Sequence, residues 1–101
     1  MQISQNILAK DLEKFNSYEI LDVRTAEEFN NGHLKNAINI DYYDVNFENE
    51  LRKLDKKKVY VIYCRSGSRS AIVLRWMKQL RFEEVYNIIN GIEKLKNILV
   101  L

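Results

Sequence analysis

The chain has 101 residues, of which 47% are hydrophobic and 30% charged, as in an ordinary globular domain. Its 16 basic and 14 acidic residues leave a net charge of +2, whereas nucleic-acid-binding domains are clearly basic. No apolar run reaches membrane-spanning length, and the N-terminus lacks the basic and apolar regions of a signal peptide. A lone cysteine cannot form an internal disulfide. We therefore expect one cytoplasmic domain over residues 1–101, with neither nucleic acid nor membrane as a partner.

The first half of the chain predicts short strands that alternate with short helices, because apolar residues recur at spacings of two and then of three to four. The expected elements are an edge strand at Asn6–Leu8, a helix over Ala9–Phe15, a buried strand over Tyr18–Val23, a helix that begins at the Thr25–Glu28 capping box, and a strand at Ala37–Ile40. Gly32 marks the end of the second helix.

The second half continues this alternation around the strand with the highest apolar density. That strand, Val59–Tyr63, is expected at the centre of the sheet. The other expected elements are helices over Phe47–Leu54 and Ser70–Leu80, a strand over Val85–Ile89, and a closing segment over Ile92–Val100 that is either helical or extended.

This order of elements indicates an α/β fold of three layers, with a mainly parallel five-stranded sheet covered by helices on both faces. Right-handed crossovers place ligand sites beyond the carboxyl ends of the strands, and Asp22 and Cys64 both stand at such ends. Trp76 and Met77 lie on the apolar stripe of the helix that follows Cys64. We expect both in the core rather than at a cofactor.

Cys64 directly follows the central strand and opens a loop of polar or small residues: Arg65, Ser66, Gly67, Ser68, Arg69 and Ser70. To lower a thiol pKa by about two units from ~8.5 takes about 2.7 kcal/mol, and a helix N-terminus supplies at most ~2 kcal/mol. Loop amides, serine hydroxyls and two guanidinium groups can supply the rest, and Gly67 lets the backbone curl around the sulfur. The polar, cationic loop favours a reactive thiolate beside an anion site over an inert buried thiol.

Two other residues outside this loop call for an interpretation. Asp22 lies in an otherwise apolar strand, so its carboxylate is expected to pair with an arginine or to fix a neighbouring loop. His33 is the only histidine, and it could act as a base for Cys64, although we favour a structural role. One cysteine and one histidine cannot complete a tetrahedral shell, so no metal site is expected.

The segment Cys64-Arg65-Ser66-Gly67-Ser68-Arg69-Ser70 resembles the active-site loop of the rhodanese-like sulfurtransferases. Four short segments earlier in the chain resemble the family's other motif and occur at the expected spacing. They are Leu21-Asp22-Val23-Arg24, Glu28-Phe29, Gly32-His33-Leu34 and Ala37-Ile38-Asn39-Ile40. The resemblance runs from about Ile7 to the final helix. Two scaffold positions differ, because Lys35 replaces the usual proline, and Asn90-Gly91 leads to Leu95 where the family has two glycines and a tryptophan.

The resemblance implies a rhodanese-like fold and a persulfide mechanism without a cofactor. Cys64 would take sulfur from a small anionic donor such as thiosulfate and pass it to cyanide, to a thiol or to a protein acceptor. The amides from Arg65 to Ser70 would hold the transferred sulfur, and Arg65 and Arg69 would attract the donor. Asp22 and Arg24 would support the loop without reacting.

Two other functions remain open at this point. Cysteine-dependent phosphatases and arsenate reductases have a similar loop on a related fold, but with five residues between cysteine and arginine, where this chain has four. The tighter loop suits a single sulfur better than a tetrahedral oxyanion. The other alternative is a non-enzymatic module of the rhodanese type that carries sulfur or binds a protein partner.

Overall fold

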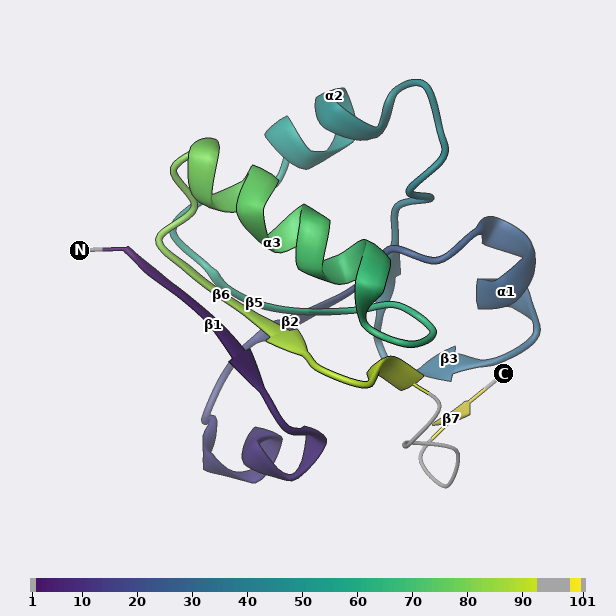
Figure 1. The fold of residues 1–101 in the computed structure, drawn as a ribbon, viewed down its shortest axis with the longest axis horizontal. Helices are drawn as coiled ribbons and strands as arrows, with labels where there is room; N and C mark the ends of the chain where they lie inside the picture. Colours follow the sequence, from purple (N-terminus) through teal and green to yellow (C-terminus); the bar gives the residue numbers. More distant parts are fainter. Residues whose placement is uncertain (1, 93–98, 101) are drawn as a thin grey trace.

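A computed structural model of the chain describes residues 2–92 and 99–100. Its centre is a five-stranded parallel sheet with the order β1-β6-β5-β2-β4 (Figure 1). The strands are β1 (Ile3–Ile7), β2 (Glu19–Asp22), β4 (Ile38–Asn39), β5 (Val59–Tyr63) and β6 (Glu84–Ile88). The expected α/β fold with a parallel sheet is confirmed, and β5 is its middle strand.

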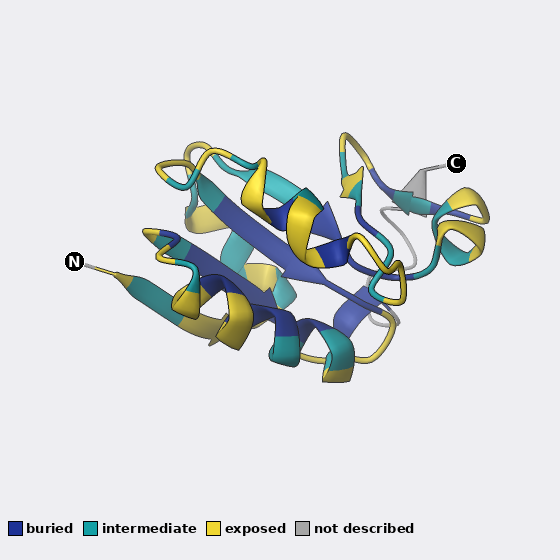
Figure 2. Ribbon diagram, turned by 90° about the horizontal axis from the view of Figure 1, so that it is seen from above, coloured by how far each residue is buried: buried dark blue, intermediate teal, exposed yellow. Residues whose placement is uncertain are grey.

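Helices lie on both faces of this sheet, as the sequence predicts. The two on one face are α2 (Phe47–Arg52) and α3 (Ser68–Gln79), and the 3-10 helix η1 (Ala9–Lys14) lies on the other face (Figure 1). The short helix α1 (Ala26–Asn30) lies near the carboxyl end of the sheet. In Figure 2 the central strands are buried, while the outer sides of the helices are exposed.

The two faces of β5 belong to two separate cores because successive side chains of a strand point to opposite sides. Ile62 and Cys64 pack with side chains of α2 and α3, whereas Val61 and Tyr63 pack with residues of β6 and η1. All four side chains are fully buried. Cys64 therefore directly follows the buried middle strand of the sheet.

Several sequence expectations need correction. The first strand begins earlier than expected and ends before Leu8, which is 42% exposed, and the helix after it is a 3-10 helix. Helix α3 begins at Ser68, two residues earlier than expected. Met77 is buried as expected, but the core position for Trp76 is wrong, because this side chain is 38% exposed and stacks on Tyr42.

A small second sheet was not expected. Strand β3 (His33–Leu34) pairs antiparallel with β7 (Leu99–Val100). The helix predicted over Ile92–Val100 falls mostly on residues 93–98, which lie outside the described residues, and Leu99–Val100 is extended. None of the helices that the structure describes has both the length and the apolar character needed to cross a bilayer.

Candidate active site

The Sγ atom of Cys64 lies at the carboxyl end of β5, inside a ring of hydrogen-bond donors. The amide of Gly67 donates to Sγ over 3.1 Å, and the amide and hydroxyl of Ser70 both donate over 3.4 Å. The Cys64 residue is fully buried, and so is Ser70. Of the loop amides that the sequence predicts to face inward, those of Gly67 and Ser70 donate to Sγ.

Two opposing effects set the pKa of the Cys64 thiol. Burial raises this pKa, because it removes the thiolate from water. Hydrogen bonds from the hydroxyl and amide of Ser70 and from the amides of Gly67 and Ser66 lower it, and together they outweigh the burial. The pKa of Cys64 therefore lies below its ordinary value, and the loop favours the thiolate, the nucleophilic form of cysteine.

A second glycine, Gly91, packs against the backbone of the loop, and the sequence did not predict this role. Gly91 has a φ angle of +58°, and a Cβ atom there would come within 2.5 Å of the carbonyl carbon and oxygen of Arg65 and would also meet the carbonyl oxygen of Cys64. The amide of Ile92 donates to that Cys64 oxygen over 2.9 Å. Only glycine fits between the two backbones, so Gly91 is part of the loop's support as well as of a turn.

Arg69 connects the loop to helix α1 through a bidentate ion pair. Its two terminal nitrogens donate to the carboxylate oxygens of Glu28 over 2.8 and 3.1 Å. This contact lowers the pKa of Glu28 to about 2 and raises the pKa of Arg69, to which the charge on Cys64 also contributes. Thr25 forms the expected capping box with Glu28. The Arg69 guanidinium also lies 5.9 Å from the centre of the Tyr43 ring.

Asp22 and Arg24 form a buried network beside the loop. The Arg24 guanidinium donates to both carboxylate oxygens of Asp22, at 2.8 Å for the shortest contact, and also to the carbonyl oxygen of Gly32. The Tyr63 hydroxyl donates to Asp22 over 2.6 Å and accepts from the Leu34 amide. Because Tyr63 precedes Cys64, the network fixes the end of β5. The predicted pairing of Asp22 with an arginine is confirmed.

The other candidate residues lie further from the sulfur. Arg65, Ser66 and Ser68 are exposed residues of the loop. His33 stacks on Phe29 with 3.8 Å between ring centres, and its Nδ1 lies 3.0 Å from the Phe29 carbonyl oxygen. Among the described residues, no hydrogen bond joins His33 to Cys64. These contacts fit the structural role that we favoured for this histidine.

The arrangement combines the buried thiol of Cys64, neutral donors from the loop backbone and from the Ser70 hydroxyl, and the Arg69 guanidinium, whose charge is compensated by Glu28. It suits a nucleophilic sulfur whose charge is held by amides, as an oxyanion hole holds oxygen. Across residues 2–92 and 99–100, no three side chains of His, Cys, Asp or Glu gather closely enough to hold a metal ion. The hydrogen bonds to Sγ favour the thiolate form of Cys64, which is the form that can act as a nucleophile.

Comparison with known proteins adds to this geometry. The sequence model of the rhodanese-like domain family matches residues 4–98 of this chain. The chain is 33% identical over 95 residues to the thiosulfate sulfurtransferase GlpE of Coxiella burnetii, covering 94% of this chain and 86% of that protein. It is 34% identical over 91 residues to Bacillus subtilis YrkF, which is described as a candidate sulfur carrier protein, covering 89% of this chain. The chain spans only about half of YrkF, 48% of its length.

The fold is also shared with solved structures. A rhodanese-related protein from Thermoplasma volcanium superposes with a TM-score of 0.81 at 26% sequence identity. The superposition covers 100% of this chain and 99% of that protein. The overall fold therefore has a counterpart of nearly the same length.

Proposed function

This chain belongs to the rhodanese-like domain family, and we propose that it is a sulfurtransferase that works through a persulfide on Cys64. The observation that carries the proposal is the ring of donors around Sγ, with the Gly67 amide at 3.1 Å and the Ser70 amide and hydroxyl at 3.4 Å. These groups stabilise a thiolate without any general base. The four residues between Cys64 and Arg69 make a loop of the size that suits one additional sulfur.

In the first step, the Cys64 thiolate attacks the outer sulfur of a donor such as thiosulfate. The new Sγ–S bond forms as the bond between that sulfur and the sulfonate sulfur breaks, and sulfite leaves with the electron pair. The negative charge of the thiolate moves to the outer sulfur of the persulfide. The amides of Gly67 and Ser70 donate to the adjacent Sγ atom, and we expect the loop amides to stabilise the charge as it develops on the outer sulfur.

In the second step, a thiophilic acceptor attacks the outer sulfur of the persulfide. Cyanide gives thiocyanate, and a thiol gives a new persulfide. In both cases the Sγ–S bond breaks, and Cys64 leaves with the electron pair as a thiolate, which restores the starting state. No cofactor takes part, and a reducing compartment such as the cytoplasm keeps the lone thiol ready for the next cycle.

The proposed roles of the remaining residues follow from their contacts. We expect the exposed Arg65 to attract an anionic donor. Arg69 is paired with Glu28, and we expect it mainly to brace the loop. Asp22 and Arg24 hold the end of β5 through Tyr63 and do not touch the sulfur. We expect a thiol on a protein to serve as an acceptor as well as a small-molecule thiol, since the similar protein YrkF is described as a candidate sulfur carrier.

The test is intact-protein mass spectrometry before and after thiosulfate treatment, combined with a thiocyanate assay. The wild type should gain one sulfur atom, lose it again on addition of cyanide, and produce thiocyanate. Cys64→Ser should do none of these, while Ser66→Ala, a matched change of an exposed side chain in the same loop, should keep both signals. Sulfur transfer by Cys64→Ser would refute the proposal. Hydrolysis of an aryl phosphate without sulfur transfer would favour the phosphatase alternative instead.

A further inference from the structure

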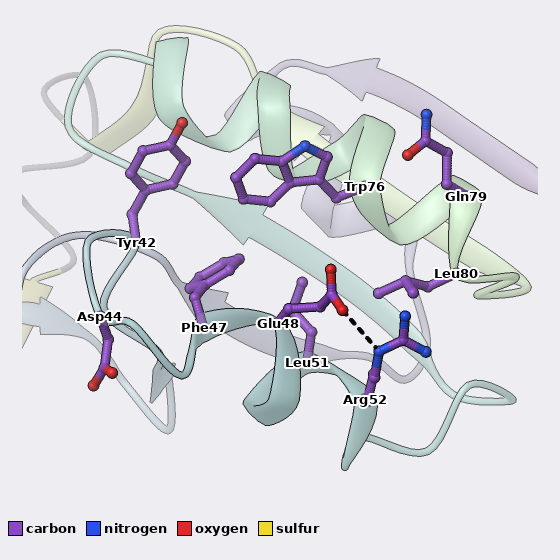
Figure 3. A pocket seen from close by; sticks show the side chains of 9 residues that line it. All are labelled: Tyr42, Asp44, Phe47, Glu48, Leu51, Arg52, Trp76, Gln79 and Leu80. Carbon is purple, nitrogen blue, oxygen red and sulfur yellow. Dashed lines mark hydrogen bonds and ion pairs between the residues drawn. The ribbon is translucent and has the colours of Figure 1, made fainter.

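A groove of about 560 Å³ runs between α2 and α3 and is not used by the proposed small substrates (Figure 3). Its walls include the aromatic rings of Tyr42, Phe47 and Trp76, with Leu80 towards the far end. The Tyr42 and Trp76 rings are parallel within 3°, with 5.6 Å between their centres, and Phe47 packs against both edge-on. The lining of the groove is therefore mixed: apolar and aromatic side chains form one part of it, and Asp44, Glu48, Arg52 and Gln79 form the other.

A continuous series of ring contacts connects this groove to the candidate active site. The Arg69 guanidinium lies 5.9 Å from the Tyr43 ring, Tyr43 lies 5.1 Å from Tyr42, and Tyr42 lies 5.6 Å from Trp76. Each step is shorter than two residues of an extended chain at about 3.3 Å per residue, so a short peptide can follow these rings. Because Arg69 belongs to the same loop as Cys64, we expect a peptide bound at this loop to reach the groove with another of its residues.

The side chains along this path are unusually exposed for apolar residues. Tyr43 is 67% exposed, Trp76 is 38% exposed, and the neighbouring Val45 is 97% exposed. Exposed apolar side chains that gather beside an active site are typical of a surface that a partner covers. Thiosulfate and cyanide are far too small to cover it.

The charge in the groove indicates which partner side chains would fit. Glu48 is paired with Arg52 over 3.1 Å, so these two charges compensate each other. Asp44 is exposed near Tyr42, and the contact that the structure shows for its carboxylate is the Asn46 amide at 2.8 Å. Asp44 can therefore still attract a cation.

We propose that this groove binds the segment of a sulfur-accepting protein that carries the acceptor cysteine. An aromatic or branched apolar side chain of that segment, four or five residues from its cysteine, lies against Trp76, and an adjacent basic side chain faces Asp44. This inference rests on the proposed function and specifies its acceptor. The acceptor thiolate attacks the outer sulfur of the Cys64 persulfide, a new S–S bond forms, and Cys64 leaves with the electrons of the broken S–S bond.

The test uses two synthetic peptides that share a cysteine and a Gly-Ser spacer. One ends with Phe-Arg at the fifth and sixth positions, and the other has Ser-Glu there. Protein loaded with thiosulfate and freed of excess donor is mixed with each peptide, and the peptide persulfide is alkylated and measured by mass spectrometry. The wild type should transfer sulfur to the Phe-Arg peptide roughly five to ten times faster at low peptide concentration, since a single buried anchor residue contributes that much.

Substitutions distinguish peptide binding in the groove from sulfur transfer at Cys64. Trp76→Ala should reduce the preference for the Phe-Arg peptide to less than about twofold while leaving thiocyanate production from cyanide within twofold. Asp44→Asn, an isosteric change in the exposed segment before α2, should reduce the preference by roughly half. Arg75→Ala, on the adjacent exposed position of α3 outside the groove, should change neither activity.

Binding is also measured without sulfur chemistry. Trp76 is the only tryptophan, so its fluorescence reports directly on the groove. The Phe-Arg peptide with serine in place of cysteine should change this fluorescence in a saturable way, and the Ser-Glu peptide should not. Equal transfer to both peptides, or an unchanged preference in Trp76→Ala, overturns the docking inference. A saturable fluorescence change in a protein that forms no persulfide would uphold the docking site and refute the proposed function.

Discussion

The hydroxyl of Ser70 is the donor to Cys64 that a single substitution can remove without changing the backbone. Ser70→Ala deletes the contact of 3.4 Å between Oγ and Sγ and leaves both amide contacts in place. Because the first turn of α3 positions the Ser70 amide, the variant should fold. We expect it to raise the pKa of Cys64, since a donor that stabilises the thiolate is lost.

The size of this change follows from the geometry. A hydrogen bond to a charged group contributes about 1.5–3 kcal/mol. The Ser70 contact belongs at the lower end, because it is long and because the same hydroxyl lies 3.3 Å from a second acceptor, the Gly67 carbonyl oxygen. A loss of about 1.4 kcal/mol corresponds to a rise of about one unit in the pKa of Cys64.

The assay is the rate of alkylation by iodoacetamide as a function of pH, which reports the thiolate of the only cysteine. The midpoint for Ser70→Ala should move up by about one pH unit. Ser68→Ala is the matched control, because that side chain is exposed and the structure shows no hydrogen bond from it to Sγ. A midpoint in Ser70→Ala at or below that of the wild type, or an equal shift in Ser68→Ala, would refute the reasoning.

Two further predictions concern the support of the loop. Gly91→Ala should destabilise the fold by about 1–3 kcal/mol in urea unfolding, because its Cβ would clash with the Arg65 backbone at a positive φ, and it should also slow persulfide formation. Glu28 has a folded-state pKa of about 2 against an ordinary 4.5, so its pair with Arg69 is fully stabilising above about pH 5. As the pH falls towards 2, the wild type should lose about 1–2 kcal/mol more stability than Glu28→Gln, after an allowance for solvent screening.

Each of these predictions has its own control. Asn90→Gly, beside Gly91, relaxes a residue with a φ of +66° and should leave unfolding within about 0.5 kcal/mol of the wild type. Gly91→Ala with wild-type stability would show that the loop can move away from the new Cβ. For Glu28, unfolding at several pH values in 1 M salt should reduce the difference between the two proteins. A parallel loss in both would assign the acid sensitivity to other carboxylates.

Local patterns were sufficient to predict much of the fold and the centre of the site. Cys64 at the end of an apolar strand, Gly67 in the turn and the serines at the start of a helix all occur within seven consecutive residues. Such patterns specify which elements form and which backbone groups face inward, because they act over one turn or one strand. The pairing of Asp22 with Arg24 is local in the same sense, since the two residues are only two positions apart along the chain.

The features that were missed depend on residues far apart in the sequence. Glu28 reads as a capping residue, yet it also binds Arg69, 41 positions away. Gly91 reads as a turn, but its contact with Arg65 requires knowing that β5 and β6 end side by side. Trp76 fits the apolar stripe of α3, yet its side chain is 38% exposed and contacts the rings of Tyr42 and Phe47. None of these contacts leaves a periodic pattern in the sequence.

The pairing of Arg69 with Glu28 also decides which groups stabilise the sulfur. A cation next to a thiolate is the simplest way to lower a thiol pKa, but the charge of Arg69 is already compensated by a carboxylate that stays ionised down to about pH 2. Neutral donors must therefore provide most of the stabilisation of the negative charge on sulfur. The amides keep their orientation whether that charge is on Sγ or on the outer sulfur. The Ser70 hydroxyl differs from them, because its single proton has both Sγ and the Gly67 oxygen within reach. In the proposed reaction it can follow the charge, donating to Sγ in the thiolate and turning to Gly67 once the charge has moved outward.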